Sequence, residues 1–412
     1  MGSTFWIETL GCPKNQVDSD KLTGALLADG FEPAGDPADA DLVVVNTCAF
    51  VEDARRESVD TILALADTRR DGARLVVTGC LAERSGPELA AAMPEIDAVA
   101  GFAMAVPVSL GRKPGAPALD LLHLPRPAPT APWAYVKVAE GCDRACGFCA
   151  IPSFRGPQRS RTPEDIVAEV DQLGAREIVL VAQDLASYGR DQGVGERGLV
   201  PLLAQVAERV ERVRLLYLYP SDLTDALVEA IGATGVPYFD LSLQHVSRPL
   251  LRRMRRWGDG DRFRARIDHI RRDLPDAALR SSFIVGYPGE TEDDHDALLR
   301  FVEEVELDWC GFFSYSPEDG TYAVDLDGRV DDDLVADRLA ELREVQDAIT
   351  ERRRAALVGE AVEVLVDRPG VGRTHREAPE IDGVVHVPVH LPVGEVASLT
   401  VVASAGPDLD AA

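Results

Sequence analysis

The sequence predicts an α/β protein of several domains: a flavodoxin-like parallel sheet first, a partial barrel next and a small β-barrel last. Three observations support this. Strand and helix patterns alternate over residues 1–110 and again over 132–358, which is typical of parallel sheets covered by helices. Proline occurs seven times between positions 107 and 132, so we expect a linker over 111–131. From position 359 onward, short β-rich runs alternate with Gly, Pro and Asp turns.

The first 110 residues contain strand patterns at 4–10, 42–45, 75–77 and 96–100. Helical patterns fall between them, at 17–28, 52–66 and 87–93. Such a rhythm places the strands side by side and parallel, with helices on both faces of the sheet.

The central region repeats the alternation over more than two hundred residues. Strand patterns occur at 134–138, 177–181, 214–218, 239–243, 280–285 and 311–315, with helical patterns between them. Six strand–helix units are two short of the eight in a complete barrel, so we expect a partial, open barrel. A long amphipathic helix over 332–357 ends this region. Strands at 362–366, 384–389 and 399–402 then predict a small all-β barrel over 359–412.

Composition narrows the class of protein. The chain carries 43 basic and 70 acidic residues, a net charge of −27, which argues against a general nucleic-acid binder. No signal peptide and no apolar run of membrane-spanning length is visible, so we expect a cytoplasmic protein without a membrane partner. Thiols in that compartment stay reduced. The seven cysteines therefore favour metal or redox chemistry over disulfides.

Three cysteines lie within eight residues, at Cys142, Cys146 and Cys149, just after the first strand of the central region. Three thiolates from one loop can hold a cubane iron–sulfur cluster and leave its fourth iron open to a substrate or cofactor. The alternative is a structural zinc site. Such a site usually needs four protein ligands, and no fourth Cys or His is near.

The cysteines Cys12, Cys48 and Cys80 each follow a predicted strand of the first domain. The carboxyl ends of parallel strands share one edge of a sheet, where ligands bind, so we expect these thiols to converge. The alternative is three unrelated buried thiols. Cys310 lies in the last predicted strand of the central region and is expected to be a buried strand thiol.

The loop over 141–149, with Phe148 before its last cysteine, resembles the cluster loop of the radical S-adenosylmethionine (SAM) superfamily. The segments 10–15, 46–48 and 78–80 resemble the three N-terminal motifs of its methylthiotransferase family. That family combines an N-terminal cluster domain, a partial TIM barrel as radical SAM core and a TRAM domain, which would cover 1–110, 132–358 and 359–412 here.

The resemblance implies two 4Fe–4S clusters and two molecules of SAM per turnover. Cys142, Cys146 and Cys149 would hold the core cluster, whose open iron chelates SAM. Cys12, Cys48 and Cys80 would hold an auxiliary cluster that carries the sulfur for transfer. An electron donor and a sulfur donor are implied as partners, and no other side chain is assigned to catalysis. Residues expected near SAM are Phe148, Gln183, Gln244, Ile284, Gly286 and Pro288; a plain strand-to-helix turn and solvated amides are the alternatives.

Two branches of the family are open. One modifies an adenosine in transfer RNA, and the other modifies the β-carbon of an aspartate in small-subunit ribosomal protein twelve. Pro13-Lys14 in the first motif and the segment 372–383 resemble the protein-modifying branch. Residues 359–412 contain nine acidic and three basic residues, and an acidic domain suits a basic ribosomal protein better than RNA. We therefore expect the protein substrate, with tRNA modification as the alternative and a non-enzymatic iron–sulfur or zinc scaffold as a remote one.

Overall fold

The computed structural model describes residues 3–102, 120–193 and 198–412. Positions 111–119 of the predicted linker lie outside the described residues. Part of the rest of that linker is packed against the protein. Leu121 and Leu122, in a short 3₁₀ helix η2 (Leu121–His123), are buried, and Lys21 donates to the carbonyl oxygen of Leu122 at 2.8 Å.

The N-terminal domain is a five-stranded parallel sheet in the order β2-β1-β3-β4-β5, which is the flavodoxin-like order. The strands are β1 (Thr4–Thr9), β2 (Glu32–Pro33), β3 (Leu42–Thr47), β4 (Arg74–Gly79) and β5 (Ala98–Val99). The helices are α1 (Pro13–Ala28), α2 (Glu52–Thr68) and α3 (Cys80–Ala92). Two of these helices begin earlier than predicted, because α1 starts directly after Cys12 and α3 starts at Cys80 itself.

The central domain contains the six predicted parallel strands. They form two three-stranded sheets, β10-β9-β6 and β11-β12-β13, joined by a parallel bridge between Leu218 and Leu241. Within the described residues, β6 and β13 are not paired with each other, so the barrel is open on that side. The strands are β6 (Trp133–Lys137), β9 (Glu177–Val181), β10 (Arg212–Leu215), β11 (Tyr238–Gln244), β12 (Ala278–Val285) and β13 (Trp309–Ser314).

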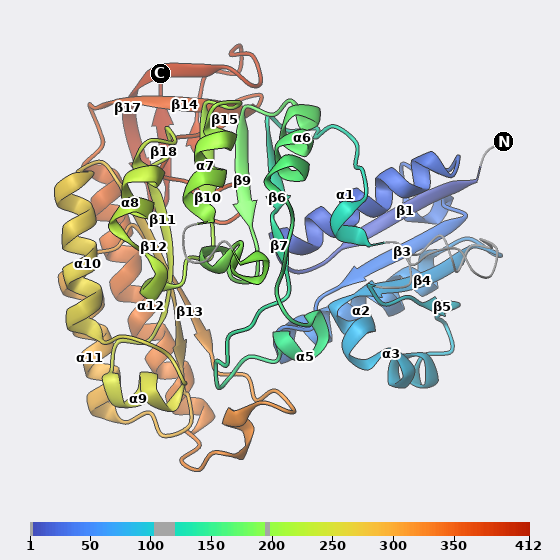
Figure 1. Cartoon of the computed structure of the whole chain (residues 1–412), viewed down its shortest axis with the longest axis horizontal. Helices are drawn as coiled ribbons and strands as arrows, with labels where there is room; N and C mark the ends of the chain where they lie inside the picture. The colour runs from blue at the N-terminus through green and yellow to red at the C-terminus, as the bar shows by residue number, and fades with distance from the viewer. Residues whose placement is uncertain (1–2, 103–119, 194–197) are drawn as a thin grey trace.

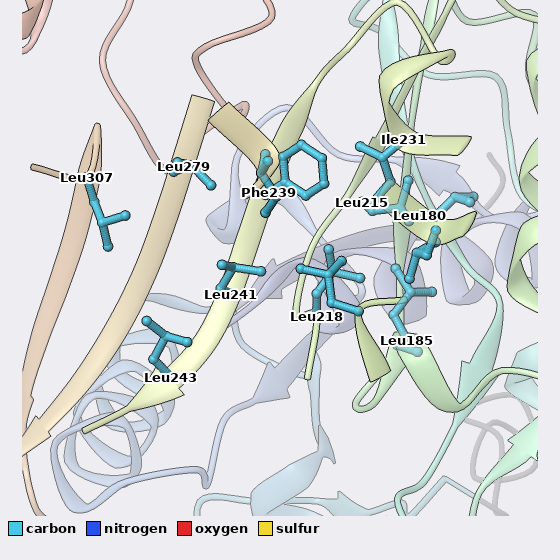
Figure 2. Packing of buried hydrophobic residues seen from close by; sticks show 14 of the residues in the cluster. Leu180, Leu185, Leu215, Leu218, Ile231, Phe239, Leu241, Leu243, Leu279 and Leu307 are labelled. Carbon is cyan, nitrogen blue, oxygen red and sulfur yellow. The ribbon is translucent and has the colours of Figure 1, made fainter. Parts of the chain in front are cut away.

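Helices cover the outside of this partial barrel. They are α6 (Pro163–Leu173), α7 (Leu199–Ala207), α8 (Asp225–Gly232), α9 (Arg248–Arg253), α10 (Gly260–Asp273), α11 (Glu292–Val305) and α12 (Asp332–Ala355). Outward-facing residues of the strands pack against them in the largest hydrophobic cluster. Figure 2 shows part of this layer, with strand residues such as Leu180, Leu215 and Phe239 near Ile231 of α8. None of the described helices combines the length and the apolar character needed to cross a bilayer.

The C-terminal domain is a closed β-barrel, as predicted, and its strand order is β14-β15-β16-β18-β17. Its strands are β14 (Ala361–Arg368), β15 (Val371–Arg373), β16 (Val385–His386), β17 (Val396–Ala405) and β18 (Asp408–Ala411). Figure 1 shows this domain in red beside the end of the central barrel from which β9 and β13 begin. The cysteine loops therefore lie at the opposite end of the barrel from the C-terminal domain.

A second hydrophobic cluster fills the inside of the partial barrel. Inward-facing Tyr135, Val179 and Trp309 pack there with Val17 of α1 and Ala378 of the loop between β15 and β16. The N-terminal and C-terminal domains thus each contribute a residue to the interior. The fold is consequently one packed unit around the central barrel, with α1 running against β6 (Figure 1).

Candidate functional site

Three of the cysteines occupy equivalent positions at the carboxyl edge of the N-terminal sheet. Cys12 is the N-cap residue of α1, Cys48 directly follows β3, and Cys80 is the first residue of α3. Gly11 and Gly79 precede two of them with φ of 95° and 91°, a conformation that glycine adopts without steric cost. These turns bring the three cysteines close to one another at this edge, as the sequence predicts.

Asn15 connects the three cysteine turns. Its side-chain amide donates to the carbonyl oxygens of Leu10 at 2.8 Å and Thr47 at 3.0 Å, and its Oδ1 lies 3.7 Å from the Cys80 sulfur. Asn15 is fully buried, so these bonds fix the ends of three neighbouring strands in place. The thiols are close enough that Cys12 and Cys80 both influence Cys48 electrostatically.

The pKa values of these three thiols shift in different directions, because positive charge is unevenly distributed around them. Burial raises the pKa of Cys48 to about 12 and also raises the pKa of Cys80. Burial acts in the same direction on Cys12, but the positive charges of Lys14 and Arg155, together with hydrogen bonds from the backbone of Asn15 and Lys14, outweigh it and lower the pKa of Cys12. Thiolate sulfur is the form that binds metal, and the nearby cations suit a site that holds several thiolates.

The second group of cysteines lies in the loop between β7 (Ala139–Glu140) and the short helix α5 (Ile151–Arg155). The loop is anchored to the end of α9, because the backbone N–H of Gly147 donates to the Met254 carbonyl at 2.8 Å. Burial raises the pKa of Cys142 to about 11 and of Cys149 to about 12, and the negative charge of neighbouring thiolates adds to both shifts. Cys146 accepts a hydrogen bond from Arg256 at 3.4 Å.

The arrangement fits clusters better than single ions. A cubane cluster spreads its sulfur ligands over a larger body than one zinc ion does. Each set consists of three cysteines, one set at the ends of parallel strands and the other in the loop between β7 and α5. In each set an arginine donates to one of the sulfurs. This donor set is the one that iron–sulfur clusters use.

The residues expected near SAM lie around the mouth of the barrel. Gln183 follows β9, Gln244 ends β11 and Ile284 is in β12, all toward the carboxyl ends of the strands. Phe148, in the cysteine loop, packs partly against the main hydrophobic cluster. Gly286 has φ of 79°, and its N–H donates to Glu290 at 2.6 Å.

Two contacts of the turn after β12 go beyond the sequence pattern. A Cβ on Gly286 would lie 2.4 Å from a Val335 methyl carbon of α12, so the turn admits only glycine. The carbonyl of Pro288 accepts from Arg253 at 2.8 Å. Five of the six residues thus lie at or just beyond the carboxyl ends of strands, and Phe148 lies in the cysteine loop. Contact with SAM stays a prediction for each of them.

Sequence reasoning missed a buried ionic network between the two cysteine sets. Lys137 at the end of β6 pairs with Asp18 of α1 and, at 2.8 Å, with Glu140. Arg155 pairs with the same two carboxylates, at 3.1 and 3.0 Å. Lysine inside an otherwise apolar strand, three residues before a glutamate, was the available signal, since charged groups are buried only when they are paired. Gln183 joins the network by donating to Glu140 at 2.7 Å.

Cys310 is a strand residue in β13, as predicted. The prediction of a buried thiol is wrong in degree, because the residue is of intermediate burial. Burial nevertheless raises its pKa strongly. It lies apart from both cysteine sets in the fold and takes no part in the site.

Three family models match the chain in the order of its domains: "Uncharacterized protein family UPF0004" over residues 4–101, the radical SAM superfamily over 136–302 and the TRAM domain over 358–412. Among solved structures, the radical SAM methyltransferase TsrM from Kitasatospora setae aligns with a TM-score of 0.55 at 16% identity, covering 76% of this chain and 73% of that one. That likeness shows the fold. Fold and family model together define a radical SAM enzyme.

Curated relatives narrow the class further. A protein of Nocardioides sp. named ribosomal protein uS12 methylthiotransferase RimO is 43% identical over 98% of this chain and 95% of its own length. A protein of the same name from Moorella thermoacetica is 44% identical, covering 92% and 91%. The chain belongs to the RimO family of radical SAM methylthiotransferases. It is therefore a transferase, and the predicted protein-modifying branch is favoured over the tRNA-modifying one.

Proposed function

We propose that this chain adds a methylthio group to the β-carbon of an aspartate in ribosomal protein uS12. The single observation that carries the proposal is that its relatives named for this reaction align over nearly the whole chain, including all three domains. The acidic C-terminal domain is consistent with a basic ribosomal partner. A ribosomal substrate places the proposed reaction in the cytoplasm. A negative domain would repel RNA, which counts against the tRNA alternative.

In this proposal the chain uses two 4Fe–4S clusters and two molecules of SAM. Cys142, Cys146 and Cys149 bind the core cluster, and Cys12, Cys48 and Cys80 bind the auxiliary cluster. When bound, the reduced core cluster supplies the electron that cleaves SAM to a 5′-deoxyadenosyl radical, and the auxiliary cluster supplies sulfur. An external reductant and a sulfur donor complete the reaction.

The chain's own residues position the reactants and exclude water. The turn at Gly286, closed by Glu290, forms one wall at the mouth of the barrel. The barrel is closed below the site by its apolar interior, which includes Tyr135 and Val179. The loop that carries Ala378 packs against this interior. Such enclosure protects a radical from solvent, and the fixed placement of both cysteine sets holds the reacting groups near each other. A C–H bond on an unactivated carbon gives up no proton to a side-chain base, so the proposal assigns none.

Anaerobic reconstitution tests the cluster assignment. The wild-type chain should bind about eight irons, and a variant with alanine at Cys142, Cys146 and Cys149 should bind about four. That variant should also form no 5′-deoxyadenosine from SAM. Continued cleavage of SAM by the variant would overturn the core assignment.

A second experiment tests the substrate. The reconstituted enzyme is incubated with SAM, reductant and either a uS12 peptide that contains the target aspartate or total tRNA. We expect the mass gain of a methylthio group on the peptide alone. A gain on tRNA alone would replace this proposal by the tRNA alternative.

A further inference from the structure

Arg155 is a residue of the central domain that reaches the cysteines of the N-terminal domain. It ends helix α5, which begins two residues after Cys149. Its Nη2 donates to the Cys80 sulfur at 3.0 Å and to Asn15 Oδ1 at 2.7 Å. The side chain is 3% exposed, so these bonds form out of contact with bulk water. One short segment of chain thus connects a cysteine of the core set with a cysteine of the auxiliary set.

The two ends of the guanidinium have different partners. Nη1 contacts the carboxylates of Asp18, at 3.1 Å, and Glu140, at 3.0 Å. Lys137 binds the same two carboxylates, so the two cations and two anions balance. Nη2 therefore donates to the Cys80 sulfur and to the side-chain oxygen of Asn15. An arginine that served only as an ion-pair partner would need no donor directed at Cys80.

Arg155 is also fixed from its other side. The ring of Phe102 lies over the guanidinium, with 4.1 Å between the guanidinium carbon and the ring centroid. Together with the two carboxylates and Asn15, this leaves the planar fork one orientation. A donor held in one orientation gives the sulfur a defined electrostatic environment.

We propose that Arg155 is a positioning residue that holds Cys80 and raises the reduction potential of the auxiliary cluster. This inference rests on the proposed function, in which Cys12, Cys48 and Cys80 bind that cluster. Reduction adds negative charge to a cluster, and a hydrogen bond to a ligating sulfur together with a nearby positive charge stabilises the reduced form. Because α5 continues from the core loop, the same residue also fixes the placement of the two cysteine sets relative to each other.

The test measures a potential rather than turnover. The full chain with alanine at Cys142, Cys146 and Cys149 holds only the auxiliary cluster in our assignment. In that background, Arg155→Lys keeps the charge but loses the planar fork, and Arg155→Met loses both. Redox titration followed by electron paramagnetic resonance should give a lower potential for Arg155→Lys than for its parent, and a still lower one for Arg155→Met.

Arg84→Lys is the matched control, since it keeps the charge and loses the planar fork as Arg155→Lys does. Arg84 lies on α3, four residues after Cys80, and binds Glu318 of the central domain and the Ala49 carbonyl, so it shares the interdomain position without a sulfur contact. Its potential should equal that of the parent. If Arg155→Lys binds its full complement of iron and has the same potential as its parent, the inference is overturned. This outcome decides the point even if Arg155→Met fails to fold. Failure of the proposed function looks different, because the parent would then bind no cluster at all.

Discussion

Tyr238 of the central barrel donates its hydroxyl proton to Asp382 of the C-terminal domain across 2.6 Å. Asp382 also accepts from the Ala378 backbone N–H at 2.9 Å and from Arg280 at 3.3 Å. On the other side of the barrel, the hydroxyl of Tyr135 donates to the Pro379 carbonyl at 2.9 Å. The loop between β15 and β16 is thus bonded into the amino-terminal end of the barrel, which gives the RimO-like segment 372–383 a structural task.

Replacement of Asp382 should destabilise the whole chain. The Asp382 side chain is 2% exposed, so Asp382→Ala leaves three donors in a buried place without their acceptor and should lower the free energy of unfolding by about 2–4 kcal/mol. Tyr238→Phe removes one hydrogen bond and should cost about 1 kcal/mol. Thermal or urea unfolding measures both. The exposed Asp410 of β18 is the control, and Asp410→Ala should change stability by less than about 0.5 kcal/mol. Equal stability of the Asp382 and Asp410 variants would contradict this role.

Gly11→Ala should damage the auxiliary site specifically. A Cβ on Gly11 would lie 2.8 Å from the Cys48 Cβ and 2.9 Å from its sulfur, so the alanine must displace Cys48. Gly30 has a similar φ of 85°, but a Cβ there meets nothing within 4 Å. Both variants should lose about 1 kcal/mol of stability from the positive φ.

Only Gly11→Ala should also lose iron, from about eight toward about four per chain. Iron analysis after anaerobic reconstitution decides the point. Full iron content in Gly11→Ala would mean that Cys48 tolerates the displacement.

Stability should fall in acid partly because of His245. This side chain is fully buried, and burial lowers its pKa to about 4 from the ordinary 6.5. Between pH 6.5 and 4 the unfolded chain binds a proton that the folded chain does not, so the contribution is complete above pH 6.5 and is lost as the pH falls to 4. The shift corresponds to about 3 kcal/mol.

His245→Asn keeps an acceptor for the Ser247 N–H, which now bonds to Nδ1 at 3.0 Å, and it removes the titration. Unfolding midpoints measured from pH 7.5 to 4 should therefore fall less steeply in this variant than in the wild type. The exposed His386 is the control, and His386→Asn should retain the wild-type slope. Identical slopes in all three proteins would exclude His245 as a source of acid sensitivity.

Loss of the auxiliary cysteines should separate SAM cleavage from product formation. With alanine at Cys12, Cys48 and Cys80, the core loop keeps its bonds to Met254 and Arg256. We expect this variant to form 5′-deoxyadenosine from SAM and to leave the uS12 peptide without a methylthio group. Chromatography of the nucleoside and mass spectrometry of the peptide measure the two outcomes. Methylthiolated peptide from this variant would show that the sulfur comes from elsewhere.

The cysteine positions could be predicted because each one follows a short apolar strand, and parallel strands share their carboxyl edge. The exact starts of α1 and α3 could not. Pro13 suits the first turn of a helix, so α1 begins at once after Cys12, but the apolar pattern becomes regular only from Val17. Inside α3, Ser85 has a non-helical conformation and Pro87 follows it, and this kink hid the first turn of the helix from pattern reading.

The end of β10 at Leu215 and the ionic network depend on contacts that no local pattern contains. Tyr217 has φ of 66°, which ends β10 early, and the N–H of Tyr217 is fixed by Asp240 of the next strand at 2.9 Å. Arg155 and Asp18 are 137 positions apart in the sequence. Such pairs form only once the domains have packed, so a sequence shows the charges without their partners.

The N-terminal domain packs against β6, at the open side of the six-stranded barrel, and this packing has an evolutionary consequence. Since α1 lies against β6 and Arg155 completes the surroundings of Cys80, the N-terminal domain does not carry its cysteine site as a self-contained module. A gene fusion that exchanged this domain alone would combine the Cys80 of one protein with the Arg155 of another. Recombination within the family should therefore keep the first domain and α5 together, and chimaeric enzymes are best joined after α5 rather than in the proline-rich linker.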